Sequence, residues 1–267
     1  MNRPRLVFCL GALLYLGSVC SVQGAITCSP ADYNGSYAFF TSGSFVQLPP
    51  QAAILQGAFA QAGTFTSDGL GNVTIVSTAS YNGIVLPAND TGTYTITKDC
   101  QMTFNVLLPP PLSAPSVFQG VLNSNNRAMS LVILSPPGTV VIGTHAKMDT
   151  LFCGTGTFRG SYGIDIGGAL ASGSPAGLFR RVGLVVSDGA GNFTATTLAN
   201  YNGQPVEEDF TGTYSVTGDC GITLAYNAPS GANITIGGYL GGHGDYAAVM
   251  ITTQGWAVSG TLNAQQP

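Results

Sequence analysis

The sequence predicts an all-β protein made of two tandem eight-stranded antiparallel up-and-down barrels. The first observation is a duplication: residues 67–72 and 91–100 return 120 positions later, at 187–192 and 211–220, with five of six and seven of ten residues identical. The second is that short segments rich in Val, Ile, Thr, Tyr and Phe alternate with Gly, Pro and Asn turn signals, as in strands and hairpins. The third is that no window shows the apolar periodicity of a helix of useful length. A two-sheet β-sandwich in each copy is the alternative.

The first 25 residues have the features of a secretory signal peptide. Arg3 and Arg5 precede an apolar run at 6–16, and small residues follow it up to Gly24 and Ala25, the expected cleavage region. The apolar run is shorter than the ~20 residues that a membrane-spanning helix needs. We therefore expect export, with the mature protein periplasmic or extracellular.

Two domains are predicted after this leader, at residues 26–149 and 150–267. Each copy contains eight strand-like segments separated by turn chemistry, so consecutive strands are expected to pair. Closure into a barrel would remove the exposed sheet edges, which a chain poor in Lys and Glu cannot protect by charge. The strands expected in the first copy are 35–40, 57–66, 72–79, 92–97, 102–108, 117–122, 128–134 and 139–146.

The alternation of side chains predicts which face of each strand is buried. Tyr94 and Ile96 share one face while the threonines around them share the other, and the second copy repeats this with Tyr214 and Val216. Outward rows of Thr and Ser suit water, whereas the lipid-facing rows of a single sixteen-stranded outer-membrane barrel would have to be apolar. No membrane insertion is therefore expected.

Charge composition restricts the partners. Only 7% of residues are charged, against about 25% in ordinary soluble domains. Without Arg3 and Arg5 the mature chain would have six basic side chains against twelve acidic ones. Such a balance argues against binding to nucleic acid or to an anionic membrane surface, both of which rely on clustered Lys and Arg.

Four cysteines remain after the leader, two in each copy, and they predict disulfides in an exported protein. In an up-and-down barrel the first strand begins, and the fourth ends, at the same rim, so each copy should have its own bridge. A zinc site would need close pairs such as Cys-x-x-Cys, which the chain lacks. The predicted bridges, whose arms would cover one barrel end and leave the other as the mouth, are Cys28 with Cys100 and Cys153 with Cys220.

The combination of Gly-Ser-Tyr at 35–37, Ser-Asp-Gly-x-Gly-Asn at 67–72, Thr-Gly-Thr-Tyr at 91–94 and Asp-Cys at 99–100 resembles a group of exported bacterial tandem β-barrel proteins of unassigned function. Their barrels are similar to those of calycins and of the allene oxide cyclase and dirigent families. The resemblance covers both copies and implies binding of small apolar or aromatic molecules in a barrel mouth, with guided cyclisation or coupling in some members. No functional residue of those families maps onto a position of this chain.

No catalytic residue, metal site or cofactor is predicted. His145 and His243 occupy non-equivalent places, and neither has a carboxylate or cysteine partner placed by the sequence. The Asp68 to Asn72 turn lacks the further acidic positions of a calcium loop, so it is interpreted as structural. The acidic residues 207–209 have no charged counterpart in the first copy apart from Asp90, and we interpret them as a solvated loop.

A recurring set of tyrosines is expected to point into the barrels, where filling of the core competes with the lining of a pocket. We predict a secreted, non-catalytic tandem barrel that binds a small apolar or aromatic ligand. The alternatives are a structural or cell-surface-associated protein and a barrel enzyme of the cyclase or dirigent type, and the lack of catalytic groups favours a protein that is not an enzyme. The possible pocket residues are Tyr37, Tyr94, Tyr162 and Tyr214.

Overall fold

The structure is a computed structural model that describes residues 27–48, 50–108, 115–122, 128–135, 137–149, 152–171, 176–229 and 231–265. The predicted signal peptide, residues 1–25, lies outside these residues, as does residue 150, where the second predicted domain begins. Three short 3₁₀ helices accompany the strands: η1 (Pro30–Asp32), η2 (Pro50–Leu55) and η3 (Thr155–Thr157).

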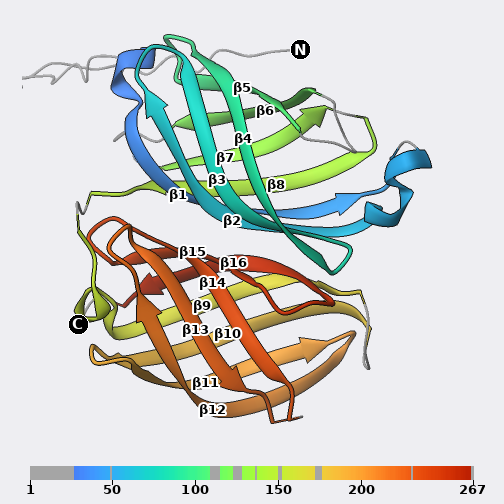
Figure 1. Ribbon diagram of the computed structural model, residues 1–267, viewed down its shortest axis with the longest axis vertical. Coiled ribbons are helices and arrows are strands. Elements are labelled where there is room, and N and C mark those ends of the chain that lie inside the picture. The colour runs from blue at the N-terminus through green and yellow to red at the C-terminus, as the bar shows by residue number, and fades with distance from the viewer. Residues whose placement is uncertain are drawn as a thin grey trace, which may run out of the picture.

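Sixteen strands form two closed antiparallel barrels of eight strands each, so the predicted fold class is confirmed (Figure 1). Neighbouring strands pair in chain order, and each barrel closes where its last strand pairs with its first. The first barrel consists of β1 (Asn34–Phe45), β2 (Gly57–Asp68), β3 (Asn72–Tyr81), β4 (Ile84–Ile96), β5 (Gln101–Leu107), β6 (Pro115–Leu122), β7 (Ala128–Ser135) and β8 (Thr139–Lys147). The second consists of β9 (Arg159–Leu170), β10 (Gly177–Asp188), β11 (Asn192–Tyr201), β12 (Gln204–Val216), β13 (Gly221–Asn227), β14 (Asn233–Gly241), β15 (Tyr246–Ile251) and β16 (Trp256–Ala264).

Strand β4 is longer than the sequence predicts, because it begins at Ile84 instead of residue 92. Pro87 and its neighbours look like a turn in the sequence, yet they pair with β3. The partner on the other side, β5, pairs with β4 only over Gly92–Ile96. Pro87 thus lies in a stretch paired on one side, where proline is tolerated as at a sheet edge.

The hairpin between β3 and β4 turns through Asn82 and Gly83, whose φ angles are 49° and 84°. Positive φ at both central residues is the conformation that makes Asn-Gly a favoured two-residue hairpin turn. A Cβ atom on Gly83 would lie 2.8 Å from the Cα of Gly255 in the second barrel. Glycine at this position therefore allows both the turn and the close approach of the two barrels.

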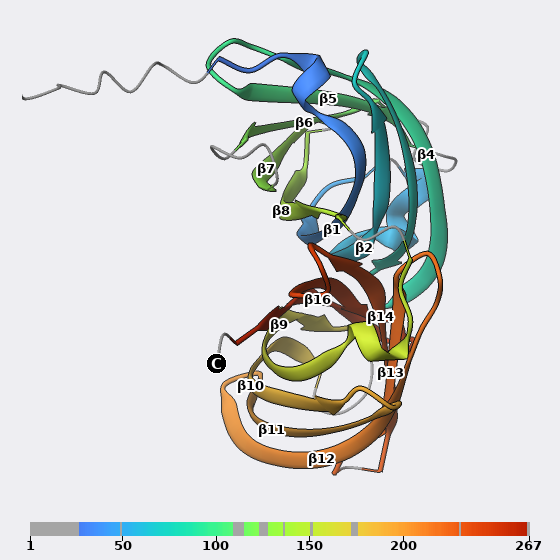
Figure 2. The same cartoon turned by 90° about the vertical axis from the view of Figure 1, so that its left-hand side faces the viewer.

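The barrels pack directly against each other, as the views in Figures 1 and 2 show. Strands β1 and β2 of the first barrel contact β14, β15 and β16 of the second. The Ser259 hydroxyl donates to the Thr41 carbonyl (2.8 Å), and the Ser80 hydroxyl donates to the Trp256 carbonyl (2.6 Å). These contacts join the outer wall of one barrel to that of the other.

The apolar interiors of the two barrels differ. In the second barrel the buried apolar side chains form one continuous cluster that includes Phe158, Phe193 and Leu262. The first barrel has two separate clusters, one around Tyr33 at the disulfide end and one around Phe45 at the opposite end. The middle of the first barrel is therefore less completely filled.

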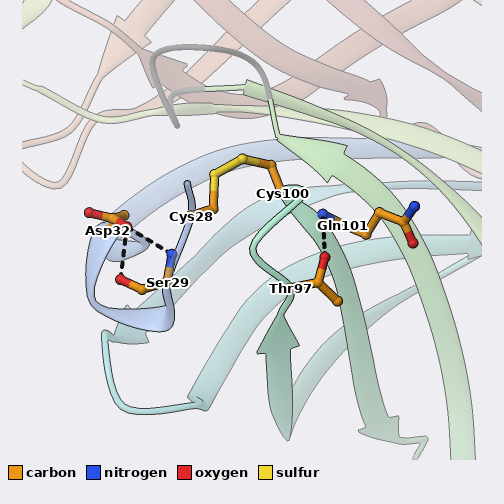
Figure 3. The surroundings of a disulfide bond; sticks show 6 residues. All are labelled: Cys28, Ser29, Asp32, Thr97, Cys100 and Gln101. Carbon is orange, nitrogen blue, oxygen red and sulfur yellow. Dashed lines mark hydrogen bonds between the residues drawn. A yellow bond between two sulfur atoms is a disulfide. The ribbon is translucent and has the colours of Figure 1, made fainter. Parts of the chain in front are cut away.

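Both predicted disulfides are present. The Cα atoms of Cys28 and Cys100 are 5.0 Å apart, and those of Cys153 and Cys220 are 4.9 Å apart. In the first barrel the arm after Cys28 forms η1, where the backbone N–H and hydroxyl of Ser29 both donate to the Asp32 carboxylate at 2.8 Å (Figure 3).

The two ends of the first barrel are both covered. Tyr33, at the end of the η1 arm, is fully buried, as the predicted closure of this end requires. The opposite end, predicted to be the open mouth, carries η2, whose Ala52 and Leu55 are buried against the cluster around Phe45. The prediction of an open mouth is therefore wrong for this barrel, because the β1–β2 connection folds back over the end.

Removing either disulfide should destabilise its own barrel. Each bridge closes a loop with a sequence separation of 72 or 67 residues, for which the chain-entropy account gives about 4 kcal/mol. We expect Cys153→Ser/Cys220→Ser to lower the denaturation midpoint reported by Trp256, the single tryptophan, more than Cys28→Ser/Cys100→Ser does. Equal shifts from both pairs would contradict separate stabilisation of the two barrels.

Candidate functional site

The first barrel contains a cavity of about 60 Å³ beside the apolar cluster around Tyr33, which supplies most of its buried apolar lining. Its lining comes from inward-facing positions of seven strands, such as Phe104 and Val106, which alternate along β5 with more exposed neighbours. Most of the lining is apolar. The lining residues are Phe39, Thr41, Gln61, Phe65, Val73, Ile75, Asp90, Phe104, Val106, Leu108, Phe118 and Leu131.

Two of the polar lining residues hydrogen-bond to each other. The Thr41 hydroxyl donates to the Gln61 side-chain carbonyl at 3.2 Å, and the Gln61 amide donates to the Ser77 hydroxyl at 2.8 Å. Ser77 in turn donates to the carbonyl of Ala88 at 2.8 Å. This chain satisfies the Gln61 side chain and holds it against the wall formed by β1, β2 and β3.

Asp90, on β4, is the one titratable residue of the lining. Its exposed fraction is 8%. Within the described part of the chain, its carboxyl group forms no hydrogen bond or ion pair, and burial raises its pKa above the ordinary value. Burial and the nearby Asp90 raise the pKa of Tyr81 to about 12. The cavity thus contains a largely buried acidic group without a hydrogen-bonding partner among the described residues, and its oxygens are not fully enclosed, so a molecule in the cavity can reach them.

The second barrel places larger side chains at the equivalent positions. With the repeat offset of 120 residues, Gln61 corresponds to Arg181, Asp90 to Phe210 and Val106 to Tyr226. The Phe210 and Tyr226 rings stack with centroids 4.1 Å apart. This part of the second barrel is therefore filled by side chains.

Arg181 and Glu208 form a buried ion pair inside the second barrel, with exposed fractions of 1% and 6%. The guanidinium also bonds the Tyr226 hydroxyl, and the Tyr201 hydroxyl donates to the Glu208 carboxylate at 2.9 Å. The central carbon of the Arg181 guanidinium lies 5.2 Å from the centroid of the Phe210 ring. The prediction that residues 207–209 form a solvated loop is wrong for Glu208, because β12 extends through this segment and turns Glu208 inward.

The four tyrosines predicted as possible pocket residues are buried but do not line the cavity. Tyr94 donates its hydroxyl to the Tyr33 carbonyl at 3.0 Å, and Tyr214 donates to the Phe158 carbonyl at 2.8 Å. Tyr37 stacks on Tyr33, and Tyr162 stacks on Phe158, with ring centroids 4.4 Å and 4.2 Å apart. All four hold the arm that closes the disulfide end of their barrel.

The histidines are placed as structural or solvated residues. His145 is fully buried with its Nε2 atom 2.8 Å from the Tyr33 hydroxyl, and burial lowers its pKa to about 3. His243 lies exposed in a turn. Among the described residues, no group of His, Cys, Asp and Glu side chains is arranged to hold a metal ion. No helix in this part of the chain is long and apolar enough to cross a membrane.

The Asp68 turn has the structural role that the sequence suggests. One carboxylate oxygen accepts the backbone N–H groups of Leu70 and Asn72 at 2.7 and 3.0 Å, and the other accepts the Asn72 amide at 2.6 Å. Asp188 repeats the arrangement with Ala190 and Asn192. Both oxygens are thus engaged within the turn itself.

Comparisons with known protein families, curated proteins and solved structures find no match to this chain.

Sequence reasoning missed Asp90 and Gln61 as lining residues. Asp90 lies an even number of residues from Tyr94 on β4, so both side chains point to the same, inner face. Alternation would therefore have placed Asp90 inside if the predicted strand had begun before residue 92. Comparison of the two copies would also have shown the exchange of Gln61 for Arg181 and of Asp90 for Phe210. The extra length of β4 was the missing signal.

Breaking the buried ion pair should destabilise the second barrel strongly. We expect Arg181→Met to lower the free energy of unfolding by about 3–5 kcal/mol, because it leaves Glu208 buried without its partner. Adding Glu208→Met should restore most of the loss. The control is Arg180→Met, since Arg180 and its partner Asp165 are 62% and 48% exposed and such pairs contribute less than about 1 kcal/mol. Trp256 fluorescence during denaturation measures all three, and a double variant no better than the single one would contradict the pairing.

The Asp188 turn should weaken in acid. Hydrogen bonds from Asn192 and Ala190 lower the pKa of Asp188 from 3.8 to about 2. Because the folded-state value is the lower one, the stabilisation is present above pH 3.8 and is lost as the pH falls through about 2. Carboxyl-carbon NMR titration should find this midpoint, and Asn192→Ala should move it upward. A midpoint near 3.8 in the unaltered protein would contradict the hydrogen-bonded turn.

Proposed function

We propose that this is an exported binding protein whose first barrel holds a small apolar or aromatic molecule in its interior cavity. The observation that carries the proposal is the difference between the two copies: three positions that line a cavity in the first barrel are occupied by Arg181, Phe210 and Tyr226 in the second. Ligand sites are commonly concave, apolar and provided with a few polar groups.

The size of the cavity sets the size of the ligand. About 60 Å³ exceeds the roughly 10–15 Å³ needed for one water molecule but is below the roughly 150 Å³ of an engineered cavity that binds benzene. We expect a short branched chain, or a single ring if lining side chains move aside to enlarge the cavity. Phe118 and Leu131 are among the lining side chains that are only partly buried, and we expect them to move aside for it.

Export is the second part of the proposal. The apolar leader with Arg3 and Arg5 has the form of a signal peptide, and two intradomain disulfides are typical of proteins in oxidising compartments. The barrel fold is also compatible with the resemblance to calycin and dirigent barrels, which bind small molecules in their interior.

A barrel enzyme of the cyclase or dirigent type is the second candidate, because Asp90 supplies an acidic group inside a cavity. Acid–base catalysis commonly needs a second group to return or accept the proton. No other titratable residue is among the described residues that line the cavity. Binding therefore accounts better for the site than catalysis does.

Filling the cavity should abolish binding. Val106→Tyr introduces the residue found at Tyr226 of the second barrel, and Asp90→Phe introduces the counterpart of Phe210. In the unaltered protein, we expect toluene and benzyl alcohol to shift backbone amide resonances of the first barrel, and both variants to remove these shifts. The control is Val121→Tyr, because Val121 is 57% exposed on the same barrel.

A cavity that takes neither toluene, benzyl alcohol nor a charged analogue would overturn the proposed function. Circular dichroism of each variant separates loss of binding from loss of folding, and the two variants fill the cavity from different strands.

A further inference from the structure

We infer that the ligand of the first-barrel cavity is a small organic cation, an alkyl- or arylammonium whose charge pairs with the Asp90 carboxylate. This inference rests on the proposed function and narrows the chemical class of its ligand. It follows from the unsatisfied carboxyl group, from the aromatic lining and from the arrangement inside the second barrel.

The described lining offers the Asp90 carboxyl group no cationic partner. Asp90 is almost fully buried, and no lysine or arginine is among the described residues that line the cavity. The Gln61 amide group donates one N–H to Ser77 and its carbonyl accepts from Thr41. A neutral apolar ligand would complete the desolvation of this carboxyl group without satisfying it, whereas a cation would both pair with it and favour its ionised form.

The rest of the lining also suits an organic cation. Four phenylalanines border the cavity: Phe39, Phe65, Phe104 and Phe118. The faces of aromatic rings attract ammonium and guanidinium groups, and aromatic cages are a common means of recognising them. A metal ion is not favoured, because calcium and magnesium require about six oxygen ligands and the lining offers one free carboxylate.

The second barrel contains such an arrangement within its own chain. There the Arg181 guanidinium pairs with Glu208, and its central carbon lies 5.4, 5.2 and 5.7 Å from the ring centroids of Phe179, Phe210 and Tyr226.

The first barrel has a carboxylate at a different position of the corresponding strand and lacks the cation. Strand β4 of the first barrel corresponds to β12, the strand that carries Glu208. The position equivalent to Glu208 is Ala88, and Asp90 lies two residues after it on β4. The arginine position is occupied by Gln61. A ligand ammonium would supply the charge that Arg181 supplies in the second barrel.

Calorimetric titration of the mature, disulfide-bonded protein tests this inference. The probes are benzylammonium and isobutylammonium, with benzyl alcohol and isobutanol as neutral matches. We expect each ammonium to bind at least about 10-fold more tightly than its alcohol, as for hydrogen bonds between charged groups. Asp90→Asn, which preserves shape, should remove this preference. Asp99→Asn, at an exposed turn of the same barrel, should leave the preference unchanged.

A second variant introduces the cation covalently. Gln61→Arg should pair with Asp90 as Arg181 pairs with Glu208, and should abolish ammonium binding. Combined with Asp90→Asn it should show a lower melting midpoint than Gln61→Arg alone, because the buried guanidinium then lacks its partner.

The outcomes separate the two proposals. Alcohols that bind as tightly as ammoniums, with no effect of Asp90→Asn, would overturn the cation inference and leave the cavity as a binding site for neutral molecules. Failure of all four probes to bind would overturn the proposed function as well.

Discussion

The interior of a closed eight-stranded barrel has a nearly fixed width, because strand number and stagger together set the diameter. Each inward position must therefore be occupied by a side chain of suitable size or left as a void. Both barrels share the same chain-order pairing and the same closure of last strand on first. With the wall fixed in this way, a few inward substitutions decide whether a barrel is filled or hollow.

The two copies meet this constraint differently. The second fills its centre with an ion pair and stacked rings, an arrangement whose desolvation cost is offset only when the charges are well paired. The first has shorter side chains at the same places and retains a cavity, which lowers stability relative to a filled core. A barrel tolerates this loss of stability more easily when other interactions stabilise it. Here the disulfide and the Tyr33 arm hold one end of the barrel, and η2 covers the other.

Contact between the barrels lets the second barrel support the cavity wall of the first. Strands β1 and β2, which carry Thr41 and Gln61 of the cavity wall, are also the strands that pack on β14–β16. The Ser259 hydroxyl bonds the backbone of Thr41 from the far side of that wall. The filled barrel thus supports the wall against which a ligand would lie.

The sequence by itself determined the duplication, the strand order, the barrel class and the cysteine pairing. These follow from local turn chemistry, from period-two alternation and from the rule that a first and a fourth strand share one rim. The tertiary structure alone decided which barrel is hollow and which polar residues face inward. Asp90 and Glu208 lie in segments that resemble solvated turns, and they become interior residues only because β4 and β12 extend along their neighbours β3 and β11. Whether a cavity exists depends on the summed volume of side chains from many strands, which no local pattern of residues records.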